Sequence, residues 1–185
     1  MIILASASPR RQELLSIICD NFKIEPSDVD ETVDKSVPIE SIPEMLALKK
    51  AEHIHRNNHY NDIVVGCDTG VFLDDKVLGK PADKSDAFRM LKSLSGRTHK
   101  VITGCAILYK HEVITFSQVT KVTFYELSDN EINGYISTNE PMDKAGAYGI
   151  QGKGSVLVKE IHGDYFNVVG LPVSLLNKKL KELSL

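Results

Sequence analysis

The stretch IVVGCDTGVFLDDKVL, residues 63–78, indicates that the fold is built on a sheet. Its first five residues are small or apolar without alternation, which is typical of a strand covered on both faces. VFL and KVL, separated by Asp74 and Asp75, predict a small hairpin. Asp68 and Thr69 directly follow the apolar run. Ligands in open α/β sheets bind beyond the carboxyl ends of strands, so Asp68 is a candidate to hold a divalent cation or to take a proton from water. A turn aspartate that caps the next segment is the alternative.

The rest of the chain mixes helices and strands. Helices are predicted from Ser8–Pro9, over residues 41–56 and 83–94, from Ser128 to about Ser137, and after Pro172. Strands are predicted at residues 2–4, 22–25, 100–110 and 113–125, with a further pair, 155–161 and 166–170, around Gly163–Asp164. Ser8, Ser41 and Ser128 are interpreted as helix caps, the last two in capping boxes with Glu44 and Glu131. This order predicts an α/β to α+β fold with a mixed sheet and flanking helices, in one domain over residues 1–185.

Composition excludes several classes of protein. Hydrophobic residues make up 42% and charged residues 25% of the 185 residues, as in ordinary soluble globular domains. The 22 Lys and Arg against 25 Asp and Glu give a net charge of −3, which argues against a general nucleic-acid binder. No apolar run approaches the ~20 residues of a membrane span, and the opening residues do not form a signal peptide. Cys19, Cys67 and Cys105 are odd in number and far apart, so we expect small buried hydrophobes in a reducing cytoplasm.

The strongest local signal is SASPRR, residues 6–11, after the first predicted strand. Ser8 is placed to cap a helix, Pro9 fits its first turn, and Arg10 and Arg11 add two cations. Free N–H groups at a helix start and two guanidinium groups favour a polyphosphate site. A capped surface helix with solvated arginines explains the same residues equally well.

Other charged residues are weaker candidates when each is taken alone. Glu31, in the acidic segment DVDETVD, could supply oxygen ligands to Mg²⁺, although a solvated acidic loop is the simpler interpretation. Lys50 lies near a predicted helix end, Lys80 lies in the rigid segment GKP (79–81), and Arg97 lies in SGRTHK. Each of these cations is more commonly a solvated surface charge.

Three patterns resemble sites that we discount. GIQGKGS, residues 149–155, lacks the P-loop spacing and precedes a predicted strand instead of a helix. His55 and His59 have the spacing of helical metal ligands, but no glutamate follows His55 as in zinc proteases. Cys67 belongs to an apolar strand, and the sequence places no histidine beside it.

Seven segments taken together resemble the Maf proteins, the septum-formation-inhibitor family, in the order in which that family has them. They are LASASPRR, DVDE, LKKAE, CDTGVFLDDKVLGKP, SGRTHKVITG, DKAGAYGIQGKG and FNVVGLP. The resemblance runs nearly end to end. It implies a nucleoside triphosphate pyrophosphatase with a fold like that of inosine triphosphate pyrophosphatases, in which two lobes flank a phosphate-binding cleft. It also implies a homodimer.

The same resemblance implies roles for individual residues. Asp68 matches the proton acceptor of the family. Arg10, Thr69 and Gln151 match the residues that mark the branch acting on dTTP and UTP, whereas the branch acting on 7-methyl-GTP has an acidic residue near the glutamine position. The segment GCDTG, residues 66–70, departs from the usual ADTVV, but its aspartate and threonine are retained.

These residues together suggest metal-assisted hydrolysis of a triphosphate. The candidates for binding phosphate are Ser8, Arg11, Lys50 and Lys80, with Arg10 as a further cation, and those for Mg²⁺ or Mn²⁺ are Glu31 and Asp68. The resemblance implies that water attacks the α-phosphorus, leaving a nucleoside monophosphate and pyrophosphate, and positioning and charge stabilisation would carry most of the rate.

Two other kinds of function stay open at this point. The protein could bind nucleotides as a regulator of cell division without turning them over, or it could be a different phosphohydrolase such as a monophosphatase. The products formed from a panel of nucleoside triphosphates would distinguish the three. Pyrophosphate indicates the pyrophosphatase, orthophosphate indicates another phosphohydrolase, and binding without any product indicates the regulator.

Overall fold

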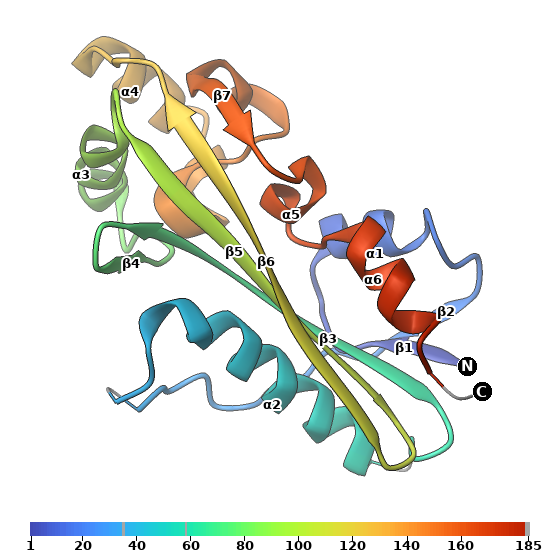
Figure 1. Cartoon of the computed structure of the whole chain (residues 1–185). Helices are drawn as coiled ribbons and strands as arrows, with labels where there is room; N and C mark the ends of the chain where they lie inside the picture. Colours follow the sequence, from blue (N-terminus) through green and yellow to red (C-terminus); the bar gives the residue numbers. More distant parts are fainter. Residues whose placement is uncertain (35, 58, 184–185) are drawn as a thin grey trace. The chain divides into compact units, whose positions relative to one another are not determined.

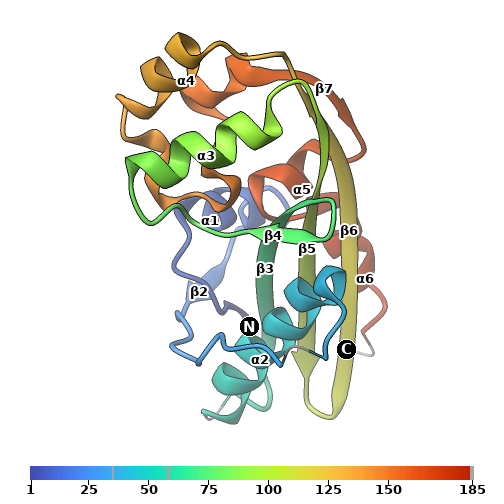
Figure 2. The same ribbon diagram turned by 90° about the vertical axis from the view of Figure 1, so that its left-hand side faces the viewer.

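The computed structural model describes residues 1–34, 36–57 and 59–183, and the elements below are those of these ranges (Figures 1 and 2). The strands are β1 (Ile2–Leu4), β2 (Phe22–Ile24), β3 (Ile63–Leu73), β4 (Lys76–Leu78), β5 (Thr98–Tyr109), β6 (Glu112–Phe124) and β7 (Val158–His162). The helices are α1 (Pro9–Leu15), α2 (Ile42–Arg56), α3 (Lys84–Leu94), α4 (Asp129–Ile136), α5 (Tyr165–Val169) and α6 (Val173–Leu180). Short 3₁₀ turns cover Ile39–Ser41, Glu140–Asp143, Ala145–Ala147 and Gly152–Leu157.

The strands form one mixed sheet in the order β2-β1-β3-β5-β6-β7, with β4 paired to β3. β1 runs parallel to both β2 and β3, whereas β4 pairs antiparallel with β3 and β7 with β6. The chain divides into two compact units. The first comprises Met1–Thr69, Thr103–Gln118 and the described residues from Gly170 onward, and the second comprises Gly70–Ile102 and Val119–Val169. The predicted mixed α/β sheet with flanking helices is confirmed.

In the first unit, α2 lies very close to the sheet because two strand positions carry glycine. A Cβ on Gly66 would lie 2.2 Å from the carbonyl oxygen of Ala47, and one on Gly104 would lie 2.2 Å from the backbone nitrogen of Glu44. Any larger side chain would push the helix away. The apolar core beneath the helix consists of Ile3, Ala5, Ala47, Ala51, Ile54, Val64, Ala106 and Leu108. This close packing sets where the polar face of α2 presents its side chains.

The second unit has its own apolar core around α3 and α4. Its large members include Leu91, Leu94, Phe124, Ile132 and Tyr148. Asp83 caps α3 by accepting from the Asp86 backbone N–H at 2.7 Å, and Ser128 and Glu131 form the predicted capping box of α4. No described helix is both long enough and apolar enough to span a membrane.

The strand carrying Asp68 is longer than predicted. β3 continues through Asp68 and Thr69 to Leu73, so these residues lie inside the strand and not beyond its end. β1 covers only Ile63–Val65 of β3, and β4 covers only Val71–Leu73. β1 stops pairing with β3 at Leu4, which lies opposite Val65, so the strand end nearest Asp68 is the carboxyl end of β1.

Four further local predictions were wrong. Residues 166–170 are not a strand: α5 covers Tyr165–Val169, and the Asp164 carboxylate accepts from the Phe166 N–H at 2.8 Å, as at a helix start. Residues 155–157 lie in a 3₁₀ turn, and β7 begins only at Val158. Ser41 makes no side-chain cap, because it lies in the 3₁₀ turn Ile39–Ser41 with helical dihedral angles, and Glu44 accepts from the Ser117 hydroxyl at 2.6 Å. Cys19 is only half-buried, although Cys67 and Cys105 are buried and all three are free thiols.

A buried histidine in the second unit makes stability depend on pH. His99 is 2% exposed, its Nε2 lies 2.7 Å from the Tyr148 hydroxyl, and its Nδ1 has no partner among the described residues. Burial lowers the pKa of His99 from 6.5 to about 4. Between these values only the unfolded chain takes up the proton, so the contribution is fully present above pH 6.5 and is lost as the pH falls towards 4.

We therefore expect the free energy of unfolding to lose about 2 kcal/mol between pH 7 and pH 5 through His99 alone. Denaturant unfolding of wild type, His99→Gln and the exposed-site control His162→Gln at both pH values measures this contribution. The free energy of unfolding of His162→Gln should change between pH 7 and pH 5 as it does in wild type. In His99→Gln this change should be smaller by about 2 kcal/mol. Equal pH dependence in all three proteins would contradict the assignment.

Candidate active site

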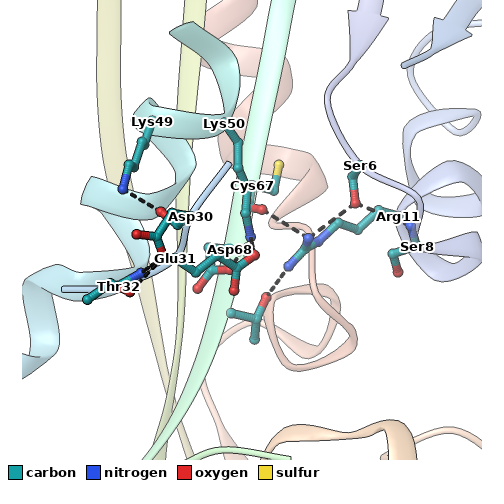
Figure 3. Close-up of polar contacts among 11 residues, drawn as sticks. Ser6, Ser8, Arg11, Asp30, Glu31, Thr32, Lys49, Lys50, Cys67 and Asp68 are labelled. Atoms are coloured by element: carbon teal, nitrogen blue, oxygen red, sulfur yellow. Dashed lines mark hydrogen bonds and ion pairs between the residues drawn. The ribbon is translucent and has the colours of Figure 1, made fainter. Parts of the chain in front are cut away.

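A lysine between two carboxylates forms the centre of the site (Figure 3). Lys50 Nζ donates to Asp68 Oδ1 at 2.7 Å and lies 2.8 Å from Glu31 Oε1. The side chains of Lys50 and Asp68 are 11% and 17% exposed, whereas that of Glu31 is 58% exposed. Lys50 lies in the middle of α2 and is largely buried, so its predicted place near a helix end was wrong.

The environment of Asp68 makes its carboxylate a better base than an exposed aspartate. Burial raises the pKa of Asp68 above its ordinary value of 3.8, against the opposing effects of Lys50 and Arg11, and nearby Glu31 raises it further. A higher pKa means a stronger affinity of the carboxylate for a proton, as a general base needs. The ion pair with Lys50 holds the carboxylate in place.

Glu31 is carried by a loop that has its own hydrogen bonds. The Asp30 carboxylate accepts from the Thr32 N–H at 2.9 Å and from the Thr32 hydroxyl at 2.6 Å, while Lys49 donates to the Asp30 carbonyl. The hydroxyl and the N–H of Thr32 together lower the pKa of Asp30. The segment thus contacts α2 through the Asp30 carbonyl and the Glu31 carboxylate, while the side chains of Asp30 and Glu31 remain exposed to solvent.

Arg11 ties four segments of the first unit together. Its Nε donates to the Gly170 carbonyl at 2.9 Å, and its Nη1 donates to the Cys67 carbonyl at 2.9 Å and to the Ser6 hydroxyl at 3.3 Å. Its Nη2 donates to the Thr69 hydroxyl at 3.0 Å. A guanidinium has five N–H groups, so these contacts leave one for a ligand. Arg11 thus fixes the strand on both sides of Asp68.

Thr69 is held from two directions. Besides accepting from Arg11, its Oγ1 lies 2.9 Å from the Thr103 hydroxyl on β5. Ser6 and Thr103, which sequence reasoning did not single out, are both buried polar side chains in this network. Ser6 lies within the quoted SASPRR segment, but only the fold brings Thr103 beside Thr69, since the two are 34 positions apart.

The start of α1 differs from the prediction. Pro9 is the first helical residue, as expected, but the Ser8 side chain makes no cap, and the Ser8 N–H donates to the Ser6 hydroxyl at 3.3 Å. α1 has seven residues, too few for a strong helix dipole, so the guanidinium groups supply most of the positive charge here. Arg10 is partly exposed and has no side-chain partner in the described part of the chain.

The remaining two predicted residues, Lys80 and Gln151, belong to the second unit. Both side chains are exposed, and neither has a hydrogen bond or ion pair with another described residue. Lys80 follows β4, and Gln151 precedes the 3₁₀ turn Gly152–Leu157. The structure therefore brings together Arg11, Glu31, Lys50, Asp68 and Thr69 in the first unit, with Ser8 and Arg10 on the adjoining α1 segment.

The discounted patterns have other roles in the structure. His59 lies between Glu25 and Asp62, with nitrogen–oxygen distances of 2.9 and 3.1 Å. The Sγ atoms of Cys67 and Cys105 lie 3.7 Å apart on neighbouring strands. GIQGKGS leads through a 3₁₀ turn into β7, which is not the strand-to-helix passage of a P-loop.

The donor set around Lys50 suits a hard divalent cation in the presence of phosphate. No group of three His, Cys, Asp or Glu in the described ranges could hold a metal ion by itself. Glu31 and Asp68 nevertheless already share one cation, the ammonium of Lys50. Mg²⁺ is typically bound by one or two carboxylates and completes its shell with substrate phosphate and water. The two carboxylates therefore fit a metal that arrives with a polyphosphate.

A family model described as Maf-like protein matches residues 1–183. The chain belongs to the Maf-like protein family. A relative from Bacillus anthracis named dTTP/UTP pyrophosphatase is 49% identical over 184 residues, covering 100% of this chain and 96% of the relative. A relative from Bacillus mycoides with the same name is 49% identical over 181 residues, covering 98% of this chain and 94% of that protein.

Solved structures share the fold of this Maf-like chain. The Staphylococcus aureus Ham1 protein aligns with a TM-score of 0.58 over 97% of each chain, at 15% sequence identity. A HAM1 protein from Coxiella burnetii aligns with a TM-score of 0.57 over 98% of each chain, also at 15% identity. At this identity the likeness concerns the fold alone, and it confirms the predicted class.

Proposed function

We propose that this Maf-like chain is a nucleoside triphosphate pyrophosphatase that hydrolyses dTTP and UTP to the monophosphate and pyrophosphate. The observation that carries the proposal is the largely buried Asp68 carboxylate, held by Lys50 beside Glu31 near the carboxyl end of β1. The name dTTP/UTP pyrophosphatase of relatives that are 49% identical over the whole chain supports the choice of substrate. We further propose that residues 1–185 act as one Maf-like domain, as a homodimer, in the cytoplasm.

Asp68 takes the proton of the water that attacks the α-phosphorus. Its raised pKa gives the carboxylate a greater affinity for that proton, and Lys50 keeps Oδ1 fixed. General-base catalysis of this kind contributes about 10²–10⁴-fold to a rate. Arg11 supports the same step indirectly, because it holds the Cys67 carbonyl and the Thr69 hydroxyl on either side of Asp68.

The five charged candidate residues of the first unit carry too little net positive charge to bind a triphosphate unaided. Arg10, Arg11 and Lys50 contribute three positive charges, and Glu31 and Asp68 contribute two negative ones. A triphosphate brings about four negative charges, so further cations are needed. Lys80 is proposed as one of them, with Ser8 as a hydroxyl donor to phosphate. Glu31 and Asp68 would hold Mg²⁺ or Mn²⁺, which supplies charge neutralisation on the phosphates and acidifies bound water.

The products of the reaction test this proposal directly. The purified protein is incubated with dTTP, UTP, CTP, ATP and GTP, with Mg²⁺ or Mn²⁺ or with a chelator. Pyrophosphate and monophosphate in equal amounts from dTTP and UTP, lost with the chelator, are expected. Orthophosphate release would indicate another phosphohydrolase, and binding without turnover would indicate a nucleotide-binding regulator; either result contradicts the proposal.

Gln151 is proposed to read the pyrimidine base, with Arg10 and Thr69 as the other specificity residues. Uracil and thymine present N3–H between two carbonyl oxygens, and one amide can both donate and accept. Gln151→Glu removes the donor. We expect kcat/KM for dTTP and UTP to fall about tenfold or more, and the preference over CTP to shrink, because cytosine offers an amino group that a carboxylate can accept.

Steady-state kinetics on dTTP, UTP, CTP and GTP measure this prediction. Asn133→Asp makes the same amide-to-carboxylate change at an exposed position of α4 and should leave the substrate ratios unchanged. Identical ratios in Gln151→Glu and wild type would remove the base-reading role from Gln151.

A further inference from the structure

Residues 149–154, the segment that carries Gln151, are held by hydrogen bonds to the Glu140 carboxylate and to Tyr135. Glu140, in the 3₁₀ turn Glu140–Asp143, accepts from the Lys153 N–H at Oε2 and from the Gly154 N–H at Oε1, both at 3.0 Å. Its Oε1 also accepts from the Tyr135 hydroxyl at 3.0 Å. Three donors on one side chain point to an ionised carboxylate that has a structural purpose here. All of these residues belong to the second unit.

Tyr135 connects the same carboxylate to the other end of the segment. The Gly149 N–H donates to the Tyr135 hydroxyl at 3.1 Å, while that hydroxyl donates to Glu140. Tyr135 lies on α4 and is 5% exposed, so its ring is fixed in the core. Residues 149 and 153–154 are therefore tied to one point, and the two residues between Gly149 and Gly152 form a closed bend.

Glycine is required where this bend closes. A Cβ on Gly154 would lie 2.4 Å from the Gly149 carbonyl oxygen and 2.6 Å from the Tyr135 hydroxyl oxygen. Gly152 has a φ of +72°, in the left-handed region that favours glycine, and a Cβ there would lie 3.0 Å from Glu140 Oε2. The backbone at Gly152 and Gly154 therefore leaves no room for a side chain next to Glu140 and Tyr135.

The two residues inside the bend, Ile150 and Gln151, have opposite surroundings. Ile150 is 7% exposed and anchors the bend in the core, whereas Gln151 is exposed and has no hydrogen bond within the described ranges. The charge of Glu140 is stable in this setting. Burial opposes its ionisation, but the N–H groups of Lys153 and Gly154 and the hydroxyl of Tyr135 lower the pKa of Glu140 overall.

We propose that Glu140 is a positioning residue that sets pyrimidine specificity by fixing the backbone on both sides of Gln151. The proposal rests on the proposed function, because it assumes that Gln151 contacts the base of a pyrimidine nucleoside triphosphate. Glu140 itself touches no substrate. Its effect passes through the orientation of the Gln151 side chain, which a loose bend would leave free to rotate away from the base.

Glu140→Gln tests this with the smallest possible change. The amide oxygen can replace one carboxylate oxygen, but its NH₂ group then faces an N–H donor and repels it. We expect the ratio of kcat/KM for dTTP over CTP to fall about tenfold, mainly through a higher KM for dTTP, with kcat little changed. Tyr135→Phe removes the tie at Gly149 and should shift the ratio in the same direction by about threefold. Glu126→Gln, at an exposed site of the same unit, should match wild type.

A double variant separates positioning from general damage. If Glu140 acts through Gln151, the double variant Glu140→Gln with Gln151→Ala should show the same dTTP-to-CTP ratio as Gln151→Ala alone. Equal losses on all substrates, with additive effects in the double variant, would overturn the proposal in favour of a merely structural role. A wild-type ratio and KM in folded Glu140→Gln would overturn it as well. If Glu140→Gln does not fold, Tyr135→Phe decides on the same ratio.

The failure of this inference can be told from failure of the proposed function. If wild type releases no pyrophosphate from any nucleotide, the proposed function fails. If wild type is active and Gln151→Ala keeps the wild-type ratio, the base-reading role fails, and the positioning role of Glu140 is overturned with it. If Gln151→Ala changes the ratio and neither Glu140→Gln nor Tyr135→Phe does, only the inference about Glu140 fails.

Discussion

Asp68→Asn is expected to lower kcat/KM for dTTP and UTP by about 10²–10⁴-fold, the usual contribution of a general base. The amide has nearly the shape of the carboxylate and can still accept from Lys50 through its oxygen, so the contacts of β3 should survive. What disappears is the group that takes the proton from water, together with one of the two charges that share Lys50. Steady-state kinetics with circular dichroism of the same sample measure both effects.

The stability of this variant should not fall. Burial raises the pKa of Asp68 in the folded protein, so the folded state favours the uncharged side chain more than the unfolded chain does. Asparagine has nearly the same shape and no charge, so folding no longer has to remove a charged group from water at this position. Denaturant unfolding at pH 7 should give a free energy at or above that of wild type.

Asp75→Asn is the matched control, because it makes the same change at an exposed position in the β3–β4 turn. It should keep wild-type kinetics and stability. If folded Asp68→Asn retains more than about a tenth of the wild-type rate, Asp68 is not the base, and the proton must leave by another path.

Lys50→Met is expected to lower kcat/KM by about 10²–10³-fold. The change removes two charge-assisted contacts, each worth about 1.5–3 kcal/mol, and leaves two carboxylates facing each other without a cation between them. It also removes a candidate phosphate ligand. The loss of Lys50 leaves the charge of Asp68 buried without a partner, so the free energy of unfolding should fall by about 3 kcal/mol. Solvent that screens the Asp68 charge reduces this loss.

A double variant and a control distinguish the origin of these effects. Adding Asp68→Asn to Lys50→Met should restore part of the lost stability, because the uncompensated charge is gone, but it should restore no activity. Lys23→Met, at an exposed position of β2, controls for the loss of one lysine from the first unit. Wild-type kcat/KM in folded Lys50→Met would show that the buried lysine has no part in catalysis.

Arg11 illustrates why residue type alone gives an incomplete role. The sequence predicts a cation for phosphate, and one of its N–H groups is still free for that purpose. The other contacts join Arg11 to the Cys67 carbonyl, the Thr69 hydroxyl and the Gly170 carbonyl, which are 56, 58 and 159 positions away. Two of these acceptors are backbone carbonyls, which every residue carries, so no residue type could have revealed them. The bracing function of Arg11 follows from the fold.

The sequence by itself determined the features that depend on nearby residues. The capping box of Ser128 and Glu131, the turn at Asp74–Asp75 and Pro9 at the start of α1 were all predictable, because their interactions join residues a few positions apart. The seven motifs likewise indicated the Maf-like family, which the full-length match confirms. The same motifs named Asp68, Lys50 and Glu31 as candidates, without giving their mutual contacts.

The tertiary structure alone decided how those candidates meet. Asp68 lies inside β3, between the part that pairs with β1 and the part that pairs with β4. Lys50 is buried because glycine in β3 and β5 lets α2 approach the sheet. Glu44 bonds Ser117 instead of capping its own helix, and Glu140 gathers the Gln151 segment from more than ten positions away. Such contacts exist only after distant segments have packed, and until then each of these side chains hydrogen-bonds equally well to water.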